Sequence, residues 1–115
     1  NRILKKVDKG RRNYDTAARQ GALQVQAEAA IHQGRFRLAG SILTDLDDDP
    51  AFQNNSLRPQ TDLLLGMLAD AANKRKDAVI HYDQARSYKG AMRNRTVARK
   101  AKQYLDAPYR RSPSS

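Results

Sequence analysis

Two histidines, His32 and His81, are the residues of this sequence best suited to hold a metal ion or to move a proton. A structural zinc site takes about four nitrogen or sulfur ligands, and acid–base catalysis needs a reacting group within reach of the imidazole. Neither histidine has a second histidine three or four residues away, and the 115-residue chain holds no cysteine. Asp77 and Asp83 flank His81 without a nucleophile in register. We therefore predict no catalytic residues, no metal site and no cofactor.

Positive charge is the second feature that predicts chemistry. The chain carries 22 Lys and Arg against 12 Asp and Glu, which gives a net charge of +10. Residues 1–19 hold seven basic and two acidic groups, residues 86–111 hold nine and one, and the centre between them holds six and nine. Basic flanks attract nucleic acid, anionic lipid or an acidic protein surface. They also serve as solvated ends that keep a chain soluble, and the sequence leaves both interpretations open.

Within the C-terminal flank, Arg95, Arg99 and Lys102 are spaced by four and then three residues. This spacing places three cations on one face of a helix and predicts a patch for an anionic partner. Single-stranded nucleic acid is bound by basic grooves that also offer aromatic side chains for stacking, and only 6% of this chain is aromatic. We therefore expect nucleic acid to be a secondary partner class.

The apolar residues recur at helical intervals, and we see no convincing strand. We expect helices over residues 14–34, 35–50, 60–73, 75–93 and 96–106, with a short helix before them that ends near Gly10. Asp15 or Thr16 is predicted to cap the first long helix, and Thr61 or Asp62 the third. The fold class is therefore all-α, built from antiparallel helical hairpins. No apolar run reaches the roughly 18 residues of a membrane span, so we predict no membrane partner.

Small and aromatic residues recur with a longer period. Gly66, Ala78, Tyr82 and Ala85 fall on positions 8, 20, 24 and 27 of a 34-residue unit. Gly66 and Ala78 leave room where two antiparallel helices cross, and Tyr82 fills the space behind them. The small side chain of Ala85 allows the following helix to pack against this pair. The first hairpin has the same four positions 39 residues earlier, at Ala27, Ala39, Leu43 and Leu46, with Gly34 and Phe36 on positions 15 and 17. The spacing predicts a five-residue insertion between two related hairpins, the second of which lacks the glycine at its elbow.

This small–small–aromatic–small pattern resembles the tetratricopeptide (TPR) repeat, and a generic array of helical hairpins is the alternative. Residues 27–96 also resemble the N-terminal region of the anaphase-promoting complex subunit 7 family. The resemblance rests on "AEAAIHQGRFRLAGSILTDLDDDP", a proline-containing loop, a helix with "LAD", and "YDQARSYKGAMRNRT". The basic first 14 residues have no counterpart in it. The resemblance implies a non-enzymatic subunit of a ubiquitin ligase that acts in the cell cycle, located in the nucleus and cytoplasm. It also implies dimers formed through the TPR array, with the N-terminal region in the dimer contact.

In such an array the first helix of each hairpin lines the concave groove. We therefore place the partner-binding groove on Gln24, Glu28, Ile31, Leu63, Met67 and Asp70. Ile31, Leu63 and Met67 form an apolar stripe, which predicts a seat for a partner helix or a second copy of the chain. The alternative is that the flanking helices, residues 1–14 and 96–106, cover this stripe.

These observations divide the chain into a basic N-terminal segment (1–14), a TPR-like helical domain (15–107) and a disordered polar tail (108–115). The predicted function is a protein–protein interaction scaffold that forms a homodimer and contacts other protein subunits. The alternative is a basic helical adaptor that binds nucleic acid or another anionic surface through its charged flanks.

Overall fold

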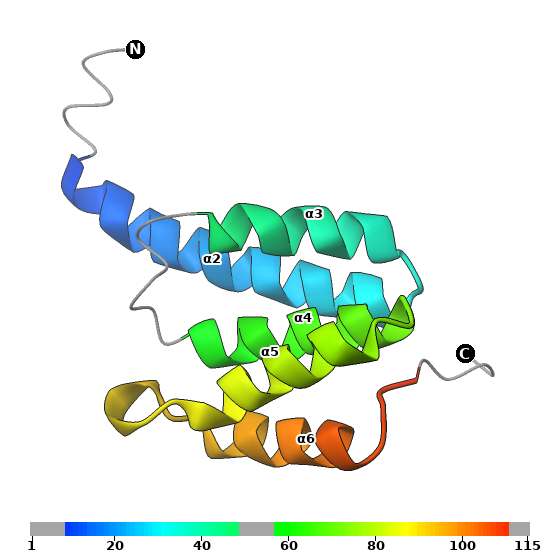
Figure 1. Cartoon of the computed structure of the whole chain (residues 1–115). Helices are drawn as coiled ribbons and strands as arrows, with labels where there is room; N and C mark the ends of the chain where they lie inside the picture. The colour runs from blue at the N-terminus through cyan, green and yellow to red at the C-terminus, as the bar shows by residue number, and fades with distance from the viewer. Residues whose placement is uncertain (1–8, 49–56, 111–115) are drawn as a thin grey trace.

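The fold was examined in a computed structural model that describes residues 9–48 and 57–110. These residues contain α-helices, one short 3₁₀ helix and no strand, which confirms the all-α prediction. The elements in chain order, drawn in Figure 1, are α2 (Lys9–His32), α3 (Phe36–Asp47), α4 (Arg58–Ala71), α5 (Arg75–Ser87), the 3₁₀ helix η2 (Gly90–Met92) and α6 (Arg95–Asp106).

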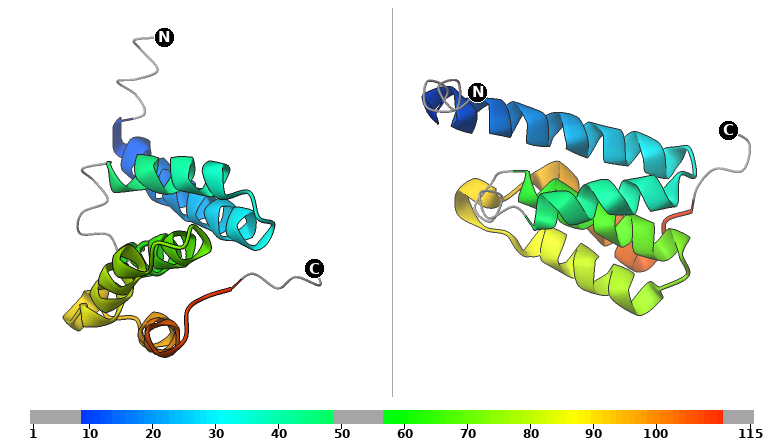
Figure 2. Two further views of the ribbon diagram at one scale, coloured as in Figure 1. Left: turned by 45° about the vertical axis from the view of Figure 1, so that its right-hand side comes forward. Right: turned by 90° about the horizontal axis from the view of Figure 1, so that it is seen from above.

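The helices form two antiparallel hairpins followed by a single helix. Helices α2 and α3 make the first hairpin, and α4 and α5 make the second. Helix α4 is central, because it packs against α2, α3, α5 and α6. Figures 1 and 2 show α6 on the side of the second hairpin that faces away from the first. The hairpins are thus stacked, and α6 closes the free side of the second one.

Both hairpins turn through the same backbone geometry. In the first elbow, Gly34 has a φ of 78° and its N–H donates to the carbonyl oxygen of Ile31, while Arg35 N–H donates to Ala30. In the second elbow, Asn73 has a φ of 60°, and Asn73 and Lys74 make the two equivalent bonds. This pair of bonds around a left-handed residue is the Schellman motif. Asn tolerates the left-handed region better than other residues with a side chain, so the second elbow needs no glycine.

The crossing of α4 and α5 explains why position 66 is glycine. A Cβ atom added to Gly66 would lie 2.4 Å from Cε1 of Tyr82. The Tyr82 ring is fully buried and cannot move aside. This confirms the prediction that Gly66 makes room for the partner helix and that Tyr82 fills the space. The equivalent pair in the first hairpin, Ala27 and Leu43, is also fully buried.

Two predicted helix starts are wrong. Helix α2 begins at Lys9 and runs through Gly10, so Asp15 and Thr16 lie inside it, and the predicted domain boundary at residue 14 falls within a helix. A glycine costs only about 1 kcal/mol in a helix interior, too little to end this one. Helix α4 begins at Arg58, with Pro59 in its first turn, a position where a missing N–H costs nothing. A helix predicted within residues 1–8 lies outside the described residues.

The helix predicted over residues 75–93 ends early, at Ser87. Tyr88 has an extended backbone, and its hydroxyl donates to the Asp62 carboxylate 2.5 Å away, so a long-range bond holds the chain where it leaves the helix. After η2, the side chain of Asn94 accepts a bond from the N–H of Val97 at 3.1 Å and starts α6. Asn is among the residues that cap helix N-termini best.

Candidate functional site

The predicted apolar stripe is not an open groove. Ile31, Leu63 and Met67 are only 0%, 1% and 4% exposed, and they belong to the same core cluster as Val97 and Ala101 of α6. The prediction that these three residues form an accessible seat is therefore wrong. Helix α6 packs on α4, the helix that carries Leu63 and Met67. Burial of the stripe agrees with the alternative that flanking parts of the chain cover it; of the two flanks named there, α6 is in contact with α4, and residues 1–8 lie outside the described residues.

The polar residues predicted for the same groove join helices together. Gln24 Nε2 donates to Thr61 Oγ1 at 2.8 Å and to the carbonyl oxygen of Leu57 at 2.9 Å. Glu28 is half-exposed and accepts a longer bond, of 3.4 Å, from Gln60. Each of these bonds connects α2 to the start of α4. Gln24 therefore positions one hairpin on the other and is not free to bind a partner.

Asp70 is the centre of a buried polar cluster. Its carboxylate accepts hydrogen bonds from the Tyr82 hydroxyl at 2.7 Å and from the backbone N–H of Tyr109 at 3.0 Å, and it pairs with Arg75 Nη1 at 3.0 Å. Arg75 also donates to the carbonyl oxygen of Leu105 at 2.8 Å. Burial and the bond to Asp70 raise the pKa of Tyr82 far above its usual value. With its oxygens engaged by three partners, Asp70 serves to join α4, α5 and the chain after α6.

The predicted disordered tail begins too early. Tyr109 is buried, its ring packs edge-on against Tyr104 with centroids 5.5 Å apart, and its hydroxyl lies 3.3 Å from His32 Nδ1. The segment after α6 therefore docks back onto the helices through residue 110. The signal in the sequence is a lone aromatic residue in the polar run "APYRR". Residues 111–115 lie outside the described residues.

A second buried carboxylate lies at the opposite end of α4. Asp62 is 1% exposed, accepts the Tyr88 hydroxyl bond, and has Arg58 Nε at 4.0 Å. Burial raises the pKa of Asp62, against the opposing effects of the Tyr88 bond and the Arg58 charge. Burial and the same bond raise the pKa of Tyr88 to about 12. Thr61 or Asp62 was predicted to cap this helix; both lie inside α4, and the cluster around Asp62 was not predicted.

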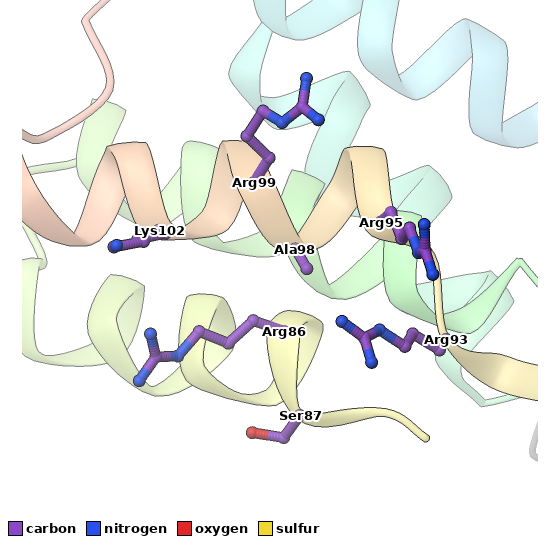
Figure 3. A pocket seen from close by; sticks show the side chains of 7 residues that line it. All are labelled: Arg86, Ser87, Arg93, Arg95, Ala98, Arg99 and Lys102. Atoms are coloured by element: carbon purple, nitrogen blue, oxygen red, sulfur yellow. The ribbon is translucent and has the colours of Figure 1, made fainter. Parts of the chain in front are cut away.

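The predicted anionic-partner patch lies in an open groove between α5 and α6. Figure 3 shows the groove, which has a volume of about 710 Å³ and is lined by Arg86, Ser87, Arg93, Arg95, Ala98, Arg99 and Lys102. The structure therefore brings together the three predicted cations, Arg95, Arg99 and Lys102. It adds Arg93, which precedes α6, and Arg86 from α5. The sequence analysis missed Arg86, because a cation on a different helix gives no signal in the spacing along α6.

The helical period explains why α6 presents cations to the groove. Val97 and Ala101 are buried four residues apart and fix which side of α6 faces the core. Arg95, Arg99 and Lys102 are all exposed. In the described parts of the chain, Arg86 pairs with Asp83 at 3.2 Å, whereas the other four cations of the groove make no ion pair. The groove thus concentrates uncompensated positive charge, which attracts anions.

Residues 9–48 and 57–110 contain neither a cluster of metal ligands nor a membrane-spanning helix. No group of three or more His, Cys, Asp or Glu side chains is placed there to hold a metal ion. No helix in these ranges combines the length and the apolar character needed to cross a bilayer. Comparison with protein-family models, curated proteins and solved structures finds no match to this chain.

Proposed function

We propose that the chain is a non-enzymatic, self-associating scaffold for protein–protein interaction, built from TPR-type hairpins. The observation that supports this is the repetition of one hairpin: two elbows with the same hydrogen bonds, 39 residues apart, and buried equivalents at Ala39 and Ala78. Repeated hairpins are typical of proteins that bind other proteins. Residues 27–96 resemble the anaphase-promoting complex subunit 7 family. On this basis we propose that the scaffold belongs to a ubiquitin ligase and is located in the nucleus and cytoplasm.

The outer face of the first hairpin is the proposed site of self-association. Val25 on α2 and Leu38 on α3 are 67% and 40% exposed. Leu38 lies with Ala29 and Ile42 along a shallow depression of about 270 Å³ between these two helices. The last hairpin of a stack leaves its outer apolar face exposed to water unless another hairpin or a polar capping element covers it. This face replaces the buried stripe as the surface on which a second copy would pack.

The test measures the mass of the chain in solution by light scattering at low and high salt. We expect a dimer that persists at high salt, because burial of apolar surface does not depend on screened charges. The double variant Val25→Glu with Leu38→Glu should be monomeric with unchanged helix content. Ile80→Glu is the matched control, because Ile80 is 56% exposed on the other hairpin. A wild-type chain that is monomeric at all concentrations would refute self-association.

The basic groove supports a second candidate function, that of an adaptor for an anionic partner. The observation that favours it is the set of four cations that pair with no carboxylate of residues 9–48 and 57–110. Affinity for a polyanion falls steeply with salt, because bound counterions are released. Titration of a labelled oligonucleotide and of an acidic peptide at about 50 and 200 mM salt tests this function. Absence of binding by both probes at low salt would exclude it.

A further inference from the structure

We propose that the groove between α5 and α6 binds an acidic, extended segment of a partner protein. The inference rests on the second proposed function and names its partner class. It follows from three observations: the charge of the groove, the geometry of its hydrogen-bond donors, and the lack of an aromatic side chain among the described residues that line it.

The charge of the groove is one-sided. Among the residues that the structure describes, its lining contains four arginines and one lysine and no carboxylate. Asp83, the partner of Arg86, lies on the adjacent turn of α5 and compensates one of these charges. An anionic ligand entering the groove therefore meets about four positive charges that no acidic side chain of the described residues neutralises. Like charges held close together repel each other, and a polyanion that bridges them relieves this repulsion.

The hydrogen-bond donors of the groove suit carboxylates that are spaced along an extended peptide. Figure 3 shows Arg93 and Arg95 at one end of the groove and Lys102 toward the other, with Ala98 between them and Arg99 rising from α6. An arginine guanidinium binds a carboxylate through two parallel hydrogen bonds, whereas lysine acts as a point charge. The short side chain of Ala98 leaves the space between the two ends open to the backbone of a ligand.

A nucleic acid fits this groove less well than a peptide. Single strands are held by stacking bases on aromatic side chains, and no aromatic side chain of the described residues lines the groove. The tyrosines nearest in sequence are engaged elsewhere: Tyr88 binds Asp62, and Tyr104 packs between Tyr82 and Tyr109. The groove therefore offers charge attraction without a base-binding platform, and a peptide that presents carboxylates needs no such platform.

Fluorescence anisotropy on the full chain tests the proposal, with a labelled oligoglutamate peptide and a labelled single-stranded oligonucleotide of equal charge. The groove variant is Arg93→Glu with Arg95→Glu. Two further variants serve as references. Lys100→Glu changes an exposed cation of α6 that does not line the groove. Arg93→Gln with Arg95→Gln removes the charges without reversing them.

We expect the wild-type chain to bind the peptide more tightly than the oligonucleotide at low salt. The Glu double variant should lose about tenfold in peptide affinity or more, the Gln double variant somewhat less, and Lys100→Glu less than about twofold. Equal losses in Lys100→Glu and in the groove variants would overturn the proposal, because net charge alone would then explain binding. Tighter binding of the oligonucleotide, lost in the groove variants, would overturn it and leave the second proposed function intact. No binding of either probe would overturn both.

Discussion

The two hairpins share a backbone and differ in what they bury. Position 31 of the first hairpin is Ile, and the equivalent position 70 of the second is Asp; both are buried. Position 43 is Leu and the equivalent position 82 is Tyr, again both buried. The first hairpin therefore packs apolar side chains at places where the second holds a carboxylate and a hydroxyl joined by a 2.7 Å hydrogen bond.

The difference shows what a buried carboxylate requires of the rest of the chain. A buried charge is tolerated only where hydrogen bonds and opposite charge surround it. Within its own hairpin Asp70 finds Tyr82 and Arg75, and the backbone N–H of Tyr109 supplies a further donor from beyond α6. The second hairpin is thus completed by the C-terminal segment, whereas dispersion and apolar burial suffice at the equivalent place in the first.

The largest expected effect comes from removing the centre of the polar cluster. Asp70→Ala leaves the buried Tyr82 hydroxyl and the Tyr109 N–H without their acceptor and separates Arg75 from its carboxylate. We expect a loss of about 3 kcal/mol in the free energy of unfolding, measured by urea denaturation. Ile31→Val at the equivalent position should cost about 1 kcal/mol. Similar losses from both variants would contradict the view that the hairpins differ in this respect.

The second prediction concerns the helix crossing. Gly66→Ala places a Cβ atom 2.4 Å from the buried Tyr82 ring. Ala favours helix over Gly by up to about 1 kcal/mol, but the overlap costs more, so we expect a net loss of about 2 kcal/mol. Tyr82→Leu copies the Ala27 and Leu43 pair of the first hairpin; it removes the hydroxyl bond to Asp70, but it should cost less in the Gly66→Ala background than in the wild-type chain, because it also removes the overlap. A double-mutant cycle on urea midpoints measures this coupling, and additive effects of the two substitutions would refute it.

The third prediction uses pH to probe the buried cluster of Asp62, Tyr88 and Arg58. The described part of the first hairpin has no equivalent of this cluster. Burial and the bond to Asp62 raise the pKa of Tyr88 from 10.0 to about 12, so the neutral hydroxyl is favoured in the folded chain. The stability that Tyr88 contributes is therefore complete below pH 10.0 and is lost as pH rises to about 12. Tyr88→Phe should cost about 1 kcal/mol at neutral pH.

In the variant, the decline of the urea midpoint between pH 10 and 12 should be shallower than in the wild-type chain. The decline will not vanish, because the pKa of Tyr82 is also raised by burial and by its bond to Asp70. Parallel midpoint curves for the two proteins would show that the Tyr88 hydroxyl does not titrate with folding.

The sequence predicted the features that depend on neighbours along one helix. Residue type and spacing along single helices predict the all-α fold class and the crossing of α4 and α5 at Gly66. They also predict the face of α6 that Arg95, Arg99 and Lys102 share. These features need only local periodicity and the size of a side chain.

The features that the sequence analysis missed depend on segments far apart in the chain. Helix α6 packs on α4, which carries Leu63, and no local pattern reveals that docking. Tyr109 lies 39 residues from Asp70 and 77 from His32, so its burial could not be inferred from the polar residues around it. Arg86 joins the basic groove from a neighbouring helix for the same reason.

The smallest expected effect tests whether the two elbows are equivalent. Gly34 and Asn73 hold the left-handed position, with φ of 78° and 60°. Because Asn accepts this conformation at low cost, Gly34→Asn and Asn73→Gly should each change the free energy of unfolding by about 0.5 kcal/mol or less. Gly34→Ala should cost about 1 kcal/mol, because its Cβ atom is strained there. Thermal and urea unfolding of the three variants measure this order, and a Gly34→Asn variant as unstable as Gly34→Ala would contradict the shared geometry. Agreement would mean that the hairpins differ in what they bury and not in how they turn.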